Sequence, residues 1–255
     1  MRILHVMAGA KHGGAETACI DMCALMAESG LDVRIATRPN ETRGARLKLL
    51  GIRTYELPFG GAADIYTPFR LARIIRDYKP DIVQTWLSRG AAKVPSRKLV
   101  NAEKDYRVVS RLGGYYKLKY FKNTDRFITI TPDIRRYLID HGVDADKVVH
   151  INNFAETETV DRPLSKTELD TPEDAAVLVC LGRLHTAKAY DILMRAVKDL
   201  EDVYVWIAGE GPERENLEKL RTELGLDARV RFLGWRTDRA TLLQAADICV
   251  FASRY

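Results

Sequence analysis

The sequence has few cysteines and no long apolar run. No pair among its four cysteines has the spacing of a zinc site or of a secreted disulfide framework, so we expect small buried thiols at Cys19, Cys23, Cys180 and Cys249. No stretch approaches the roughly 18 to 20 apolar residues that span a bilayer, and the N-terminus lacks the layout of a signal peptide. We therefore expect a cytoplasmic protein, with peripheral contact at the inner face of a membrane left open.

The first glycine-rich loop, residues 8–16 (AGAKHGGAE), lacks the common nucleotide-binding motifs. A dinucleotide fingerprint needs glycines two and five residues after its first glycine, and this loop does not keep that frame. A Walker loop needs Lys and then Ser or Thr after Gly14, where this chain has Ala15 and Glu16. What remains is the pair Gly13-Gly14 before a helix, which either lets backbone amides approach an anion or simply makes a tight turn.

Apolar residues are abundant by contrast. They make up 46% of the chain, enough for a packed core, while charges of both signs are interspersed to give a net charge of +5. The positive balance favours anionic partners without selecting one. A phosphorylated small molecule, an anionic lipid headgroup and a nucleic acid all fit this composition.

Strand and helix patterns alternate along residues 1–154. The expected strands are residues 3–7, 31–37, 52–57, 81–86, 107–111, 126–130 and 148–151. Between them, apolar residues recur at helical spacing, as in the segments that follow Gly14, Pro68 and Pro132, and we expect a further helix near residues 89–98. About seven strands joined by helices predict a mostly parallel, doubly wound α/β sheet.

The composition changes after residue 154. Residues 155–174 are polar, contain Pro163 and Pro172, and show no sustained period, as an interdomain linker does. A second series of strands and helices follows, with expected strands at residues 177–181, 203–208, 230–233 and 248–252. We predict a Rossmann-like domain at 1–154, a linker at 155–174 and a second domain of the same kind at 175–255. The last strand has no covering helix after it, so we expect the second domain to be incomplete.

Residues 177–200 read as a buried strand, a loop and a helix. The loop carries Arg183 and Lys188 with little apolar surface around them. Open α/β sheets bind ligands at the carboxyl ends of their strands, where helix amides also point at anions. The two cations are therefore either phosphate ligands or ordinary solvated loop residues.

Four motifs occur in a fixed order along the chain and resemble those of a known family. They are LGRLHTAK at 181–188, WIAGEGP at 206–212, VRFLG at 230–234 and AADICVFAS at 245–253. With Gly-Gly-Ala-Glu at 13–16, they resemble the retaining glycosyltransferases of family 4, whose architecture is called GT-B. The resemblance covers nearly the whole chain and implies two Rossmann-like domains with a cleft between them. Residues 1–154 would form the acceptor-side domain, and residues 175–255 would form the nucleotide-sugar-binding domain.

The resemblance implies a role for each motif. Arg183 and Lys188 would bind the two phosphates of a nucleotide diphosphate sugar, which Gly13 and Gly14 would approach from the first domain. A loop of Gly209, Gly211 and Pro212 would lie beside the nucleotide. The turn at Gly234 and Trp235 would lie near the base. No cofactor or metal is implied, because the cations themselves would stabilise the leaving diphosphate.

The chain departs from the family pattern at three places. Lys188 is followed by Ala189 where the family usually has glycine. No histidine follows the fourth strand, so Trp86 or Arg89 would take that part of the acceptor site, together with His12 and Glu16 of the first loop. The family's paired glutamates would lie beyond residues 253–255, so we expect a C-terminally truncated chain that lacks part of its donor site.

Two further stretches leave alternatives open. Asp144 and Asp146 form an Asp-x-Asp pattern, which metal-dependent transferases use, but we interpret them as a turn before a strand. Residues 107–122 (RVVSRLGGYYKLKYFK) are basic and aromatic, which fits an anionic acceptor, a membrane surface, single-stranded nucleic acid, or a solvated loop.

Together these features predict a retaining, metal-independent glycosyltransferase. It would move a sugar from a nucleotide diphosphate sugar to a cell-surface glycan or lipid acceptor such as lipopolysaccharide, and we expect no nucleic-acid partner. Two alternatives stay open: a sugar-nucleotide epimerase or phosphorylase of the same architecture, and a nucleotide-binding fragment without catalytic activity.

Overall fold

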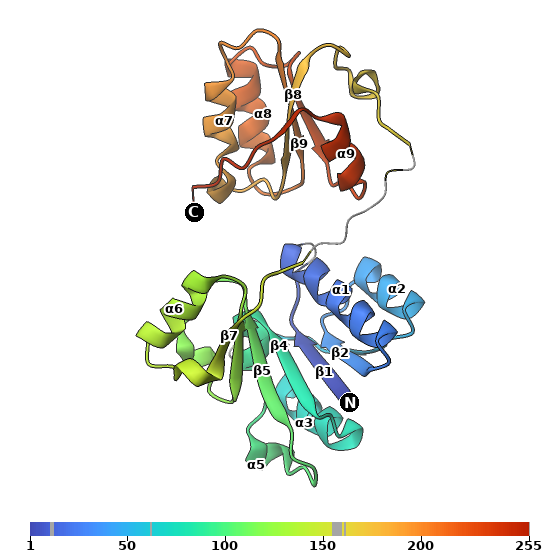
Figure 1. Cartoon of the computed structure of the whole chain (residues 1–255), viewed down its shortest axis with the longest axis vertical. Coiled ribbons are helices and arrows are strands. Elements are labelled where there is room, and N and C mark those ends of the chain that lie inside the picture. The colour runs from blue at the N-terminus through green and yellow to red at the C-terminus, as the bar shows by residue number, and fades with distance from the viewer. Residues whose placement is uncertain (11–12, 62, 155–159, 161, 255) are drawn as a thin grey trace. The chain divides into compact units, whose positions relative to one another are not determined.

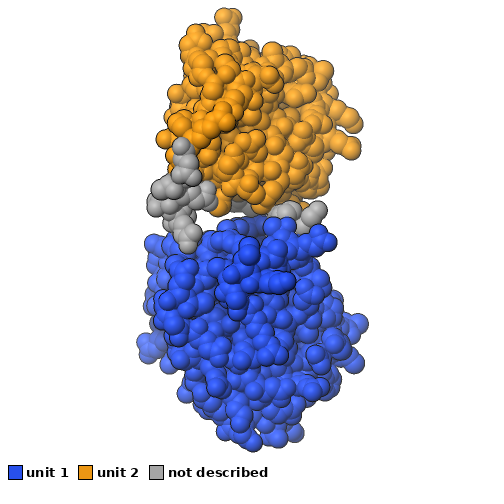
Figure 2. All heavy atoms as spheres, turned by 90° about the vertical axis from the view of Figure 1, so that its right-hand side faces the viewer, with its two compact units in different colours: residues 1–155 blue, residues 156–255 orange. Residues whose placement is uncertain are grey.

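The computed structural model describes residues 1–10, 13–61, 63–154, 160 and 162–254. The chain divides into two compact units, Met1–Ala155 and Glu156–Tyr255 (Figure 2). Each unit is built on its own parallel sheet (Figure 1). The mixed α/β class and the two parallel sheets predicted from the sequence are confirmed.

The first unit is a seven-stranded parallel sheet in the order β3-β2-β1-β4-β5-β6-β7. Its strands are β1 Arg2–Met7, β2 Asp32–Thr37, β3 Arg53–Glu56, β4 Ile82–Trp86, β5 Arg107–Leu112, β6 Arg126–Thr129 and β7 Val148–His150. Its helices are α1 Gly14–Glu28, α2 Glu41–Leu49, α3 Tyr66–Tyr78, α4 Leu87–Ala92, α5 Arg97–Val100 and α6 Pro132–Asp140. The order reverses between β1 and β4, which is where doubly wound sheets bind ligands.

Both faces of this sheet are covered around β1. Leu4 and Val6 pack with Leu71 and other residues of α3, whereas Met7 packs with Cys19 and other residues of α1. Side chains of a strand point alternately to its two faces, so the residues of β1 on both faces are buried. This explains why β1 is apolar from Ile3 to Met7 except for the buried His5.

One predicted helix is broken in the structure. The segment near residues 89–98 forms α4 and α5, separated at Pro95. Proline has no N–H and disfavours helical backbone at the residue before it, so the helix cannot continue. Ser96 then begins α5 by accepting a hydrogen bond from Leu99 N (3.3 Å).

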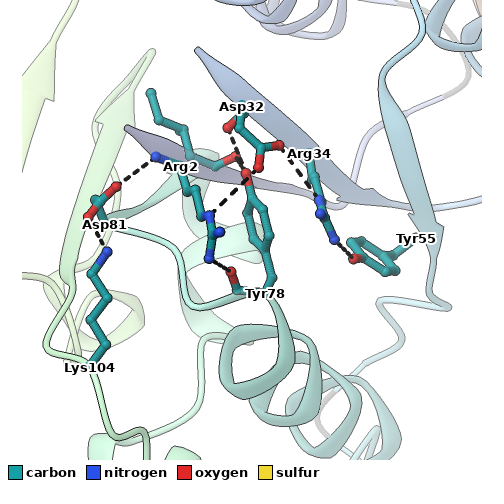
Figure 3. Close-up of polar contacts among 8 residues, drawn as sticks. Arg2, Asp32, Arg34, Tyr55, Tyr78, Asp81 and Lys104 are labelled. Atoms are coloured by element: carbon teal, nitrogen blue, oxygen red, sulfur yellow. Dashed lines mark hydrogen bonds and ion pairs between the residues drawn. The ribbon is translucent and has the colours of Figure 1, made fainter.

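A network of polar side chains joins the amino ends of β1, β2 and β4 (Figure 3). Asp81, just before β4, accepts hydrogen bonds from Arg2 N (2.7 Å) and Lys104 Nζ (2.5 Å). The Tyr78 hydroxyl donates to the Asp32 carbonyl (2.6 Å). These contacts lie at the edge opposite the carboxyl ends of the strands, so we assign them to stability.

The second unit is a four-stranded parallel sheet in the order β10-β9-β8-β11. Its elements are β8 Ala176–Leu181, α7 Tyr190–Ala196, β9 Val203–Ala208, α8 Arg214–Glu223, β10 Val230–Gly234, α9 Arg239–Ala245 and β11 Ile248–Cys249. Residues of α7 and α8 cover one face, and Leu242 of α9 packs on the other. The expected strand 248–252 is only two residues long, and the prediction of a buried thiol is wrong for Cys249, which is exposed on this edge strand.

Part of the expected linker belongs to this second unit. Residues Lys166–Leu169 form a turn of 3-10 helix, and Leu169 packs beside Trp206 of β9. The Trp206 indole N–H donates to the Thr171 hydroxyl (3.0 Å), and both side chains are buried. A buried indole needs such a partner, so residues from about 164 onward are anchored to the sheet.

No helix in the described part of the chain is both long and apolar enough to cross a membrane.

Candidate functional site

Two cations occupy the loop between β8 and α7. Arg183 follows Gly182 at the carboxyl end of β8, and Lys188 ends the 3-10 turn Thr186–Lys188. Arg183 is exposed and Lys188 is half-buried. Among the residues that the structure describes, neither side chain forms a hydrogen bond or an ion pair. Both charges are therefore available to an anion.

The side chain of Lys188 runs across Gly182. A Cβ at Gly182 would lie 3.5 Å from Lys188 Cε and 2.9 Å from the Tyr190 hydroxyl. The next residue, Ala189, has left-handed backbone (φ 54°) and is fully buried. Alanine thus adopts the conformation for which the family pattern has glycine, and the turn that carries Lys188 is kept. Burial raises the pKa of Tyr190 to about 12, so its hydroxyl stays protonated at neutral pH.

Two glycines hold this cation loop by close backbone approach. A Cβ at Gly209 would lie 1.9 Å from the Gly182 carbonyl oxygen, and one at Gly211 would lie 2.2 Å from the Leu184 carbonyl oxygen. Leu184 N also donates to the Glu210 carbonyl (3.0 Å). Because they have no side chain, both glycines let the loop after β9 pack against the backbone of the loop after β8.

The other predicted donor residues lie beside these loops. Pro212 is exposed, directly after Gly211. Gly234 has left-handed backbone (φ 67°), and its carbonyl accepts a hydrogen bond from Gly209 N (2.7 Å). Trp235 is 51% exposed. The ends of β8, β9 and β10 are thus joined into one edge, to which Arg183, Pro212 and Trp235 all belong.

A pocket of about 470 Å³ opens elsewhere in the second unit, between α7 and α8. Its lining includes His185, Asp191, Asn216 and Arg254. Neither of the two predicted cations lines it. The cation loop thus contributes His185 and Thr186 to the wall of this pocket, while Arg183 and Lys188 lie outside it.

In the first unit, Gly13 and Gly14 lead from β1 into α1. Gly14 is exposed, and a Cβ there would meet nothing within 4 Å. Gly13 lies against Glu16, whose carboxylate accepts a hydrogen bond from Ala10 N (2.6 Å). Glu16 is thus engaged with its own loop. His12, which we also expected on the acceptor side, lies outside the described residues.

Arg43 of α2 supports the same loop and was missed in the sequence analysis. The residue is 4% exposed, and its guanidinium donates to the carbonyl oxygens of Ala10 (3.1 Å) and Arg38 (2.9 Å). Burial lowers its pKa. Gly9 has left-handed backbone (φ 66°), which favours glycine, and a Cβ there would also lie 2.9 Å from this guanidinium. The available signal was the helical spacing that places Arg43 on the same inner face as Leu47.

Trp86 does not fit the acceptor role predicted for it. The side chain is 3% exposed and packs in the core between β1 and α1, where its indole N–H donates to His5 Nδ1 (3.0 Å). The guanidinium of Arg111 lies 5.6 Å from its ring centre. Trp86 is therefore a core residue. Its partners His5 and Arg111 come from β1 and β5, the strands on either side of β4.

Arg89 remains exposed at the carboxyl end of β4, in α4. Burial lowers the pKa of Arg38, which follows β2, and the nearby charge of Arg89 lowers it further. Two cations thus flank the loop that follows β1. Of the two acceptor candidates after β4, Arg89 is the one whose side chain is accessible.

Three possible metal ligands meet in the core of the first unit. His5, Cys19 and Cys23 are all buried, and their ligand atoms lie within 4.8 Å of one another. Spacing along the chain could not show this, because His5 comes from β1 and the cysteines from α1. His5 Nδ1 accepts the Trp86 N–H, whereas His5 Nε2 is buried and has no hydrogen-bond partner among the described residues.

The Asp-x-Asp pattern forms a local turn. Asp144 precedes the 3-10 turn Ala145–Lys147, and its carboxylate pairs with Lys147 Nζ (2.5 Å). That ion pair and hydrogen bond lower the pKa of Asp144. Asp144 thus stabilises the turn in which the Asp-x-Asp pattern lies, as expected from the sequence.

The basic and aromatic segment has two sides. Leu112 and Phe121 are buried, and Tyr116 packs against them. Facing solvent are Tyr115, Lys117, Lys119, Tyr120 and Lys122. The segment is therefore a strand followed by an anchored loop with an exposed basic surface.

Comparison with known proteins shows which family carries these features. The family model described as "Glycosyltransferase Family 4" matches residues 12–159, and the model described as "Glycosyl transferases group 1" matches residues 175–255. Two relatives from Rhizobium meliloti are named lipopolysaccharide core biosynthesis glycosyltransferases LpsD and LpsE. They are 34% and 36% identical to this chain over its whole length, which covers 72% and 73% of theirs.

Solved structures show the same fold. The chain matches HepE of Anabaena, solved in complex with UDP and glucose, with a TM-score of 0.80 at 19% identity, over 99% of this chain and 74% of that one. It also matches a glycosyltransferase of Rickettsia africae with a TM-score of 0.80 at 20% identity, over 99% of this chain and 73% of that one. On these matches, the chain belongs to glycosyltransferase family 4 and has the GT-B fold, and the protein is a glycosyltransferase.

Proposed function

We propose that the protein is a retaining glycosyltransferase that uses a nucleoside diphosphate sugar and needs no metal ion. The observation that carries the proposal is the pair Arg183 and Lys188. Two cations without partners among the described residues stand on a loop whose shape is set by Gly209 and Gly211. A diphosphate would supply the negative charge that pairs with these two cations.

The chemistry follows from the charge that develops in the reaction. When the bond between sugar and diphosphate breaks, negative charge grows on the leaving oxygen, and preplaced cations stabilise the transition state more than the ground state. Arg183 can grip a phosphate through two parallel hydrogen bonds, whereas Lys188 acts as a point charge. These two residues would thus do the work that a metal ion does in other transferases.

The comparisons support the choice of substrates. HepE was solved with UDP and with UDP-glucose, and LpsD and LpsE are named for lipopolysaccharide core biosynthesis. We therefore propose a UDP-sugar as donor and a lipopolysaccharide-type, lipid-linked glycan as acceptor. Retention of configuration rests on the resemblance of the motifs. Gly13 and Gly14 enter the proposal in the same way, as donor contacts from the first unit.

The test is product analysis. The protein is incubated with UDP-sugars and a lipopolysaccharide core acceptor, with and without EDTA, and the new linkage is identified by NMR. We expect transfer with the anomeric configuration of the donor, at a rate that EDTA leaves unchanged. Inversion, or loss of activity with EDTA, would contradict the proposed mechanism. Isomerisation of the donor without transfer would instead favour an epimerase, phosphorolysis of a glycan would favour a phosphorylase, and UDP binding without turnover would favour a non-catalytic protein.

A further inference from the structure

The outer side of α3 presents apolar and basic side chains in place of a mixed polar surface. Ile65, just before the helix, is 71% exposed, and Tyr66 and Phe69 are 55% and 57% exposed. The same side continues with three exposed arginines. We call these six residues the α3 stripe: Ile65, Tyr66, Phe69, Arg70, Arg73 and Arg76. Helical spacing of three and four residues places them along one face.

The apolar end of the stripe is held in place by a buried network. Asp64 accepts hydrogen bonds from Thr67 N (3.0 Å), the Thr67 hydroxyl (2.6 Å) and Gly60 N (2.7 Å). Lys93, directly after α4, pairs with the Asp64 carboxylate (3.4 Å), and both side chains are only 9% exposed. Lys93 also donates to the carbonyls of Gly61 and Asp64. The exposure of Ile65 and Tyr66 is therefore built into the fold and does not come from a frayed helix end.

The charge of the stripe is of one sign. Residues 65–76 contain three arginines and neither Asp nor Glu. Asp77 follows, but it lies 3.6 Å from Arg73 and pairs with it, and Asp64 is engaged with Lys93. Arg70 lies over the ring of Tyr66, with its guanidinium carbon 6.0 Å from the ring centre. A partner that is complementary to this stripe has an apolar region next to an anionic one.

The α3 stripe begins at the edge of the sheet where the acceptor is expected to bind. The loop before α3 leaves β3 at its carboxyl end, and β3, β2 and β1 pair in parallel. The start of α3 therefore lies at the same edge of the sheet as the glycine loop after β1. Three apolar side chains are far fewer than the roughly 20–30 residues a side of a stable protein interface, but they suffice to enter the headgroup region of a bilayer.

We propose that the α3 stripe docks the protein on an anionic lipid bilayer. Ile65, Tyr66 and Phe69 enter the interface between headgroups and acyl chains, and Arg70 and Arg76 meet anionic headgroups. Arg73 is paired with Asp77. This docking deepens the proposed function, because it brings the edge that carries the glycine loop to a lipid-linked acceptor.

The experiment is flotation of the purified protein with vesicles of phosphatidylcholine, with or without phosphatidylglycerol. We expect binding to the anionic vesicles only, and binding that falls as salt rises. Phe69→Glu should weaken it by about tenfold or more, and Arg70→Gln by about fivefold. Leu49→Glu is the matched control, since Leu49 is 88% exposed on α2, and this variant should bind as the wild type does.

Three results would overturn the proposal. One is unchanged binding of Phe69→Glu and Arg70→Gln. Another is loss of binding only in Lys117→Glu and Lys119→Glu, which would move the contact to the basic loop after β5. The third is a dimer in size-exclusion chromatography that Phe69→Glu dissociates, which would make a second copy the occupant. Transfer to a delipidated acceptor should be equal in wild type and Phe69→Glu, so failure of the proposed activity is seen separately from failure of docking.

Discussion

At the scale of single residues, glycines decide the shape of the cation loop. Gly209 and Gly211 are the positions where a side chain would strike the backbone of residues 182–184. The motif that contains them resembled a nucleotide-binding loop in the sequence. The structure shows that both glycines pack against the backbone of the neighbouring loop, which carries Arg183.

Gly211→Ala tests this packing. The added Cβ would lie 2.2 Å from the Leu184 carbonyl oxygen, so we expect a loss of about 2–3 kcal/mol in the stability of the second unit. Gly44→Ala is the contrasting variant, because a Cβ there meets nothing within 4 Å and the residue lies inside α2. It should stabilise the first unit by about 0.5–1 kcal/mol. Urea denaturation of both variants measures this, and equal effects would contradict the packing argument.

Arg43 is a second residue whose importance comes from its contacts, which join α2 to the loop after β1. Arg43→Met should cost about 2–4 kcal/mol, because it leaves the carbonyls of Ala10 and Arg38 without their donors. The amides of residues 8–10 should then exchange faster with deuterium. Arg46→Met, which removes an ion pair to Asp21 beside solvent, should cost less than about 1 kcal/mol. Unchanged exchange at residues 8–10 would show that Arg43 does not hold the glycine loop.

At the scale of elements, the carboxylate of Asp64 stabilises the start of α3 through its hydrogen bonds. Burial alone would raise the pKa of Asp64, but hydrogen bonds from Thr67 and Gly60 and the charge of Lys93 outweigh it and lower this pKa to about 2. The ionised form is therefore favoured by folding. The stability that it contributes is present above the unfolded pKa of about 3.9 and is lost as the pH falls towards about 2.

This linkage gives a measurable pH dependence. Between about pH 5 and pH 2 the first unit should lose on the order of 1–2 kcal/mol through Asp64. In Asp64→Asn that part of the loss should be missing, although the variant starts from a lower stability at neutral pH. Denaturation midpoints across this range compare the two proteins, and parallel curves would refute the assignment.

The order of elements could be predicted because strands and helices differ in period. Apolar runs marked the strands, and residues 203–208 form β9 with the predicted bounds. The break between α4 and α5 could be read from Pro95. The burial of Trp86 could not, because it depends on His5 and Arg111, which neighbour it only after β1, β4 and β5 pair.

At the scale of the whole molecule, the family could be recognised from the order of its motifs, and the site only in part. Arg183 and Lys188 stood out as cations in a loop between a buried strand and a helix. Arg43 and the docking of Thr171 on Trp206 depend on contacts between residues more than 30 positions apart, which no local pattern carries. The roles of Gly13, Gly14, Glu16 and Arg89 remain predictions.

The central claim is that Arg183 and Lys188 stabilise the leaving diphosphate. Its most direct test is kcat/KM for sugar transfer from the UDP-sugar in Arg183→Ala and Lys188→Ala, with Lys198→Ala as an exposed control in the same unit. We predict a loss of at least about tenfold in each of the first two, with stability changed by less than about 0.5 kcal/mol, and no loss in the control. Rates equal to the wild type in both variants would contradict the account.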